Sequence, residues 1–248
     1  MEKLPLQSLL DNSGLNRHHV FNLNELPNDL LEPLAPTEAE KQLIIFGNAG
    51  RKLWECVKSR SMNTDNPIDE FSVNTLRTWF QRALPEASAR FVFPIGLPPG
   101  KHVGLQRLGT LAGWHHPSPF FVGIDANFGS WFAYRAAVLT NTALQTSTIE
   151  DFGNPCLSCV SKPCISACPA SAICEDGMDM MACHTQRLQE SSACALGCLS
   201  RLACPVGAEY RYEMSQIRHS ASGSLATIRN LFREVPPQSN QPESTVER

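Results

Sequence analysis

Nine of the ten cysteines lie between residues 156 and 204. They form two motifs that each end in a cysteine followed directly by proline, with Cys174 and Cys183 between them: Cys156-x2-Cys159-x4-Cys164-x3-Cys168-Pro169 and Cys194-x3-Cys198-x5-Cys204-Pro205. Such runs ending in Cys-Pro are typical of proteins that bind iron–sulfur clusters. Proline cannot continue a helix, so the chain changes direction directly after the last cysteine of each motif. The segment therefore predicts cluster chemistry.

Two such motifs hold enough ligands for two [4Fe-4S] clusters. In two-cluster proteins of this kind, the first three cysteines of a motif bind one cluster and the cysteine before proline binds the other. We therefore assign the cysteines crosswise to two sets. The first set is Cys156, Cys159, Cys164 and Cys204, and the second set is Cys183, Cys194, Cys198 and Cys168. Cys174 and Cys56 belong to neither set.

Two other uses of clustered cysteines are open. Structural zinc also binds Cys-x2-Cys pairs, but it takes two separated pairs that close one tetrahedron, and it does not account for the Cys-Pro endings. A disulfide framework is typical of small secreted chains, whereas this chain has 248 residues. Both alternatives explain the spacing less well than two clusters do.

Composition restricts the class of protein. A hydrophobic content of 42% and a charged content of 18% are ordinary for a globular protein with a sizeable core. The net charge of −3 offers no general surface for polyanions, so no nucleic-acid partner is expected. The N-terminus lacks the basic start and apolar run of a secretory signal, and no run approaches the ~18 apolar residues of a membrane span. We expect a cytoplasmic protein without a membrane partner.

The remaining sequence predicts helices alternating with short apolar strands. A capping box at Thr37 and Glu40 predicts a helix that runs through Leu43 to Val57. Further helices are expected at 72–84, 103–111, 209–220 and 224–232, and strands at 90–94, 119–124 and 128–139. This order predicts an α+β fold, with an α/β domain at 1–150, a cluster domain at 151–233 and a disordered tail at 234–248.

Part of the chain resembles a known family. The run AGWHHPSPFFVGIDANFGSWFAYRAAVLTNTAL, with CLSCVSKPCISACPASAI, Cys183 and the late Cys-Pro, is similar to the core of the epoxyqueuosine reductases, which are cobalamin-dependent iron–sulfur enzymes. The similarity covers residues 103–207. It implies a cobalamin-reductase-like sheet layer, followed by a ferredoxin-like module with two [4Fe-4S] clusters, and it implies cobalamin as a further cofactor.

The resemblance also indicates candidate site residues. The family's catalytic acid lies before the helix that leads to the Gly-Trp turn, yet residues 91–101 contain no Asp or Glu. A reductive ring opening needs a proton donor, for which Asp125, His115 and His116 are the nearest candidates in the sequence. Tyr134 and Arg135, together with the two histidines, are candidate contacts for a corrinoid or a substrate. The alternative for each is an ordinary place in a loop or a packed strand.

Three functions remain in competition. The first is an electron-transfer protein whose two clusters relay electrons from an external donor, such as a flavodoxin or a ferredoxin reductase, to a site in the α/β part. The second is a cobalamin-dependent reductase that acts on a small molecule. The third is a structural or regulatory protein whose clusters hold the fold or sense oxygen.

Overall fold

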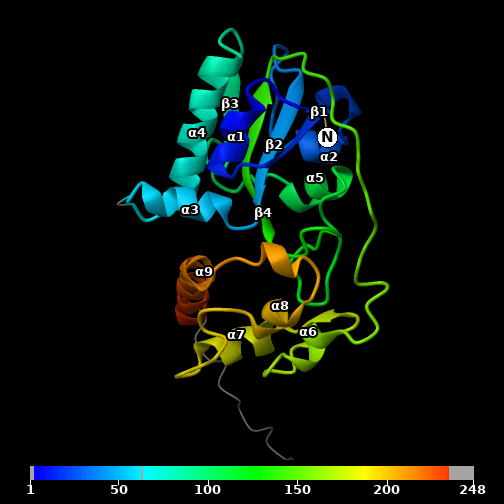
Figure 1. The fold of residues 1–248 in the computed structure, drawn as a ribbon, viewed down its shortest axis with the longest axis vertical. Helices are drawn as coiled ribbons and strands as arrows, with labels where there is room; N and C mark the ends of the chain where they lie inside the picture. The colour runs from blue at the N-terminus through cyan, green and yellow to red at the C-terminus, as the bar shows by residue number, and fades with distance from the viewer. Residues whose placement is uncertain (1–2, 63, 235–248) are drawn as a thin grey trace, which may run out of the picture.

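The computed structural model describes residues 3–62 and 64–234, and it contains a sheet layer followed by a cysteine-rich part (Figure 1). The elements of the sheet layer are α1 (Gln7–Ser13), β1 (Arg17–Asn22), η1 (Leu23–Glu25), α2 (Asn28–Leu31), β2 (Gln42–Ala49), α3 (Lys52–Ser59), α4 (Pro67–Ala83), β3 (Ala89–Phe93), α5 (Leu105–Leu111) and β4 (Phe132–Thr140). The elements that follow are α6 (Pro163–Ser166), β5 (Ile173–Cys174), β6 (Gly177–Met178), α7 (Met180–Leu188), α8 (Leu199–Ala203), η2 (Ala208–Tyr210) and α9 (Met214–Glu234).

The sheet has the order β1-β2-β4-β3, and every neighbouring pair is antiparallel. The two central strands are apolar on both faces, which is why each face needs a cover of helices. α1, α3 and α4 cover one face, and α2 and α5 lie on the other (Figure 1). The predicted α+β class is therefore confirmed.

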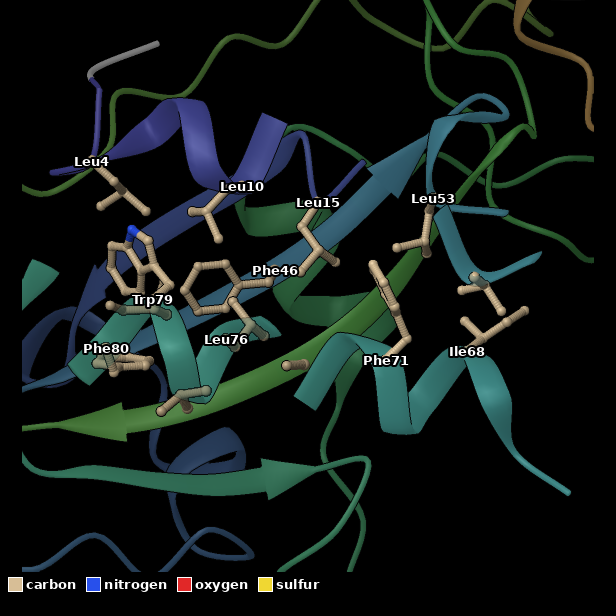
Figure 2. Packing of buried hydrophobic residues seen from close by; sticks show 14 of the residues in the cluster. Leu4, Leu10, Leu15, Phe46, Leu53, Ile68, Phe71, Leu76, Trp79 and Phe80 are labelled. Atoms are coloured by element: carbon tan, nitrogen blue, oxygen red, sulfur yellow. The ribbon is translucent and has the colours of Figure 1, made fainter. Parts of the chain in front are cut away.

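Alternate side chains of the strands divide the core between the two faces. Ile44 and Phe46 of β2 point to α4, while Leu43 and Ile45 point to the opposite face. On the α4 side, Phe46 meets Trp79 edge to face at 5.8 Å between ring centroids (Figure 2). This alternation is the period of two that a strand imposes on its side chains.

The predicted helix through Leu43 to Val57 is wrong in its first half. Residues 42–49 form the central strand β2, and the helix α3 begins only at Lys52. The run Leu43-Ile44-Ile45-Phe46 is apolar without interruption, which is the pattern of a strand buried on both faces. The capping box does not start a helix. The Glu40 carboxylate does accept a hydrogen bond from the Thr37 backbone N–H, at 2.8 Å.

Other predicted elements have mixed outcomes. The strand at 90–94 corresponds to β3, the strand at 128–139 to β4, and the helix at 103–111 to α5. The strand at 119–124 is wrong, because only Ile124 pairs there, in an isolated bridge with His116. The two helices predicted after the cysteines are one helix, α9. Residues 235–248 of the predicted tail lie outside the described residues.

A segment without helix or strand leads from β4 to the cysteines. It descends beside the sheet layer from the end of β4 (Figure 1). It is held on the way, since the Ser147 hydroxyl accepts a hydrogen bond from the Val20 backbone N–H at 3.0 Å. In the described part of the chain, no helix is long and apolar enough to cross a membrane.

Two glycines bring the cysteine-rich part against the start of β4. A Cβ atom on Gly129 would lie 2.0 Å from the Val206 carbonyl oxygen, and one on Gly207 would lie 2.3 Å from the Phe128 carbonyl carbon. Both glycines have positive φ, +58° and +63°. Only glycine allows the two backbones to approach so closely in this conformation. We call this contact the glycine seam.

The first prediction concerns the glycine seam. Gly129→Ala should lower the free energy of unfolding by more than Gly100→Ala does. Both positions have positive φ, but a Cβ atom on Gly100 meets nothing within 4 Å. The left-handed backbone alone costs about 1–2 kcal/mol, and the clash at Gly129 adds about 1–3 kcal/mol. Urea unfolding of both variants measures the difference, and equal losses would contradict the seam.

Candidate iron–sulfur site

Short elements place the nine clustered cysteines around α6, α7 and α8. Cys164 lies in α6 and Cys183 lies in α7. Cys198 and Cys204 stand at the two ends of α8. Since α6 packs against α8, the two motifs face each other. All ten cysteines are free thiols in this structure.

Four of the cysteines, Cys156, Cys159, Cys164 and Cys204, influence one another electrostatically. Burial raises the pKa of the Cys156 thiol to about 11, and the next contributions come from Cys204, Cys164 and Cys159. Burial also raises the pKa of Cys164, with Cys204 and Cys159 adding to the effect. Negative neighbours raise a thiol pKa only at short range. The cysteine before Pro205 therefore lies beside the three cysteines at the start of the segment.

The second set is grouped in the same way. Burial raises the pKa of Cys183, and among the cysteines Cys198, Cys168 and Cys194 add to the effect. A cavity of about 610 Å³ is lined by these four cysteines together with side chains of α7, α8 and α9. The cysteine before Pro169 thus lies with the second motif. Cys168 also packs in the cluster that contains Cys156, Cys164 and Cys204, so the crosswise assignment stays a prediction.

The donor sets suit iron–sulfur clusters. Each set consists of four thiols, which are the soft ligands that such clusters take. Hydrogen bonds from the backbone at Leu199 and Val206 lower the pKa values of Cys194 and Cys204, against the larger raising effect of burial. Within residues 3–62 and 64–234, no three His, Cys, Asp or Glu side chains are placed to hold a single metal ion. In a cubane cluster, each thiolate binds a different iron atom.

The two excluded cysteines lie apart from both sets. Cys174 is exposed on the β5–β6 hairpin, where its thiol donates to the Gly177 carbonyl oxygen at 3.3 Å. Cys56 lies in α3, and its thiol donates to the Asn12 carbonyl oxygen at 3.4 Å. Neither appears among the electrostatic neighbours of the two sets.

The loop at 115–124 joins the cysteines to the sheet layer. At its far end, Phe120 and Ile124 pack with Ile173 around Cys164 and Cys204. Phe120 also lines the cavity of the second set. At its near end, the loop carries His115, which packs against β4. One loop therefore contacts both thiol sets and the sheet.

His115 and Tyr134 are brought together beside the sheet. The Tyr134 hydroxyl lies 3.5 Å from His115 Nδ1, and the Tyr134 ring stacks on Trp114 at 6.1 Å between centroids. Burial raises the pKa of Tyr134, and burial, followed by the charge of His116, lowers the pKa of His115. Both side chains are therefore neutral near pH 7. Burial thus keeps the proton on the Tyr134 hydroxyl oxygen.

The other predicted contacts do not join this pair. His116 Nε2 lies 2.9 Å from the Asp151 carboxylate. Arg135 is the extra residue in a bulge of β4, where the partners of Phe46 and Gly47 are Ala136 and Tyr134. Its Nε donates to Asn48 Oδ1 at 2.6 Å. A bulge re-aims side chains, and Arg135 lines a cavity with His219 of α9. The role of each predicted site residue stays a prediction.

Asp125 forms a buried ion pair that sequence analysis missed. Its Oδ2 accepts a hydrogen bond from Arg17 Nη2 at 2.8 Å, and its Oδ1 accepts from the backbone N–H groups of Asn127 and Phe128. The Arg17 guanidinium lies 4.4 Å from the Trp114 ring centroid. Both carboxylate oxygens are used as acceptors, so Asp125 serves here to anchor the turn before β4. No motif marks Arg17, which is distant in sequence from its partner.

Comparison with solved structures finds proteins of similar fold. No protein-family model and no curated protein matches this sequence. The B12-trafficking protein CblC from C. elegans aligns with a TM-score of 0.50 and 13% identity, over 95% of this chain and 97% of CblC. Epoxyqueuosine reductase from Streptococcus thermophilus aligns with a TM-score of 0.50 and 11% identity, over 81% of this chain.

The chain shares the fold of epoxyqueuosine reductase and CblC. The resemblance inferred from the sequence is thereby confirmed at the level of the fold. The aligned region covers 65% of the length of the reductase. At identities of 11% and 13%, the alignment establishes the fold alone.

The second prediction tests the role of Asp125 as an anchor. Asp125→Asn and Arg17→Met should each lower the free energy of unfolding by about 3–5 kcal/mol, because each leaves one buried charge without its partner. The double variant should lose much less than the sum, because no unpaired charge is left. A double-mutant cycle in urea measures this coupling. The exposed pair Lys52–Glu55, at 3.9 Å, is the control, with an expected coupling below about 1 kcal/mol.

Proposed function

We propose that this chain is an iron–sulfur electron-transfer protein. Its two thiol sets bind two [4Fe-4S] clusters, which relay electrons from an external one-electron donor, of the flavodoxin or ferredoxin reductase type, to a site beside His115 and Tyr134. The crosswise grouping of eight thiols supports the proposal most directly. The cysteine-rich part would then be a ferredoxin-like module.

The surroundings of the thiols fit this role. When bound, the clusters supply reversible one-electron transfer. Apolar side chains pack beside the thiols, with Phe120 and Ile173 at the first set and Ile217 and Ile228 at the cavity of the second. Backbone N–H groups that point at sulfur stabilise its negative charge and so favour the reduced form. Both features suit an electron relay.

The pair His115–Tyr134 provides a proton at the site that accepts the electrons. Reduction of most organic groups consumes protons as well as electrons. Tyr134 is half-buried and holds its proton at the hydroxyl oxygen, beside His115 Nδ1. The loop at 115–124 links this pair to both thiol sets. Proton and electron sources therefore meet at one side of the sheet.

The third prediction tests the cluster assignment by metal content. After anaerobic reconstitution, the chain should contain about eight iron atoms and eight sulfides. Cys204→Ser and Cys168→Ser should each lose about half of both, whereas Cys174→Ser and Cys56→Ser should lose none. Zinc without sulfide in the intact chain would contradict the proposal.

Pairs of variants test the crosswise pattern itself. Cys204→Ser combined with Cys156→Ser should lose no more iron than either single variant, because both residues are assigned to the first set. Cys204→Ser combined with Cys194→Ser should lose nearly all iron. If Cys204 instead bound the same cluster as Cys194 and Cys198, the outcomes would be reversed. The variant with Cys156→Ser would then lose nearly all iron, and the variant with Cys194→Ser would lose no more than a single variant.

A cobalamin-dependent reductase is the second candidate. The fold shared with CblC along nearly the whole chain favours it, because CblC is a B12-trafficking protein. Of the four predicted corrinoid contacts, His115 and Tyr134 lie within reach of each other, while Arg135 is bound to Asn48 and His116 lies against Asp151. A corrinoid bound beside His115 and Tyr134 would serve as the electron acceptor. The substrate would be a small molecule.

The fourth prediction distinguishes the two candidates. Titration of the reconstituted chain with cob(II)alamin should change the visible spectrum if a corrinoid binds. Tyr134→Phe should then weaken binding or alter the spectrum, while Arg135→Gln should leave both unchanged. An unchanged spectrum in the parent chain would contradict the cobalamin candidate and leave the electron relay in place.

A further inference from the structure

A second cavity lies where the sheet layer meets the last helix. Its volume is about 330 Å³, and its walls come from the start of α4, from β4 and from α9. In Figure 1, α9 lies on the same side of the molecule as α3 and α4. No cysteine is among the described residues that line this space, which we call the Arg135 cavity. Its size is that of a site for a small molecule.

Contacts with α3 fix α9 as one wall of the Arg135 cavity. Trp54 Nε1 donates a hydrogen bond to the Ser215 hydroxyl at 2.8 Å. The His219 ring packs against the Trp54 ring, at 5.0 Å between centroids. Lys58 of α3 also forms an ion pair with Glu213, at 2.5 Å. His219, which lines the cavity, is therefore held in place by α3.

Arg135 is the charged side chain that β4 contributes to this cavity. It is half-buried, and the bulge of β4 directs it away from the regular alternation of the strand. Its Nε donates a hydrogen bond at 2.6 Å to Oδ1 of Asn48, which is fully buried. This bond fixes the base of the guanidinium and leaves its two terminal nitrogens for another partner. A guanidinium binds a carboxylate through two parallel hydrogen bonds.

Opposite charges line the Arg135 cavity without pairing with each other. Asp69, which is half-buried in the first turn of α4, and Asp65, which is exposed before that helix, line the same space as Arg135. Within the part of the chain that the structure describes, none of the three forms an ion pair. The carboxylates and the guanidinium thus face one space across a gap. A molecule with one positive and one negative group would bridge it.

We propose that the Arg135 cavity binds a small zwitterion, that is, a molecule with a carboxylate and an ammonium group, as in an amino acid. Arg135 binds the carboxylate, and Asp69 binds the ammonium group. Asp65 and Asp69 would repel a simple anion, and Arg135 would repel a simple cation, so a ligand with both charges suits the cavity best. The site is separate from the proposed electron transfer and does not depend on it.

Asp69 also has a structural role, which determines the control variant. An acid in the first turn of a helix stabilises the helix through the positive end of its dipole. Glu70 lies next to Asp69 in that turn, but it does not line the cavity. Removing either charge should therefore affect α4 in a similar way. A loss of ligand binding that follows only from the change at Asp69 would report the cavity and not the helix.

The fifth prediction is measured by isothermal titration calorimetry on the full chain. The probes are the standard amino acids and short ω-amino acids, of which at least one should bind saturably. Arg135→Gln and Asp69→Asn should each weaken that binding by about tenfold or more, because each removes a hydrogen bond between charged groups. Glu70→Gln should leave the affinity unchanged. Arg135→Lys keeps the charge without the paired hydrogen bonds, so it should bind with intermediate affinity, and it replaces Arg135→Gln if that variant does not fold.

Derivatives of the tightest-binding probe separate the two contacts. The amide of the probe lacks the carboxylate, so Arg135→Gln should weaken its binding much less than that of the parent compound. The N-acetyl derivative lacks the ammonium group, so Asp69→Asn should weaken its binding much less. A variant that only disturbs the fold would weaken all three compounds alike. No saturable binding of any probe, or equal losses in Glu70→Gln and Asp69→Asn, would overturn this inference and leave the iron and sulfide content of the chain unaffected.

Discussion

The close backbone contact at the glycine seam holds the two halves of this molecule in place. Gly129 and Gly207 let the turn before β4 touch the chain that follows Cys204-Pro205. Because the turn is anchored by the Asp125–Arg17 pair, the position of the last thiol is tied to the first strand of the sheet. Arg201, bound to Ser130, reinforces the same contact from α8. Changes at this seam therefore reach both the thiols and β4.

The proposed thiol sets are the part of the candidate site for which the sequence carries the strongest local signals. Cysteine spacing and the Cys-Pro endings are local signals, and the rule that a motif lends its last ligand to the other cluster does not depend on the rest of the fold. The strands at 90–94 and 128–139 were also predicted, because apolar runs bounded by Pro and Gly are local too. Long-range pairing was not needed for either inference.

Features that depend on distant partners were not predictable. The capping signal before β2 predicts a helix, although burial on both faces decides the conformation of this segment. Arg17 was overlooked because its partner Asp125 is remote in sequence. The bulge at Arg135 arises from the register between β2 and β4, which a single strand does not encode. Tertiary packing overrides local preference in each case.

The interleaving of the two thiol sets has a consequence for the order in which the chain is made. Cys156 leaves the ribosome before any member of the other set. The set to which it belongs is nevertheless incomplete until Cys204 is synthesised. The set of Cys168, Cys183, Cys194 and Cys198 is complete earlier. The set whose first cysteine is synthesised earliest is thus the last to be complete. Synthesis of α8 separates the completion of the two sets.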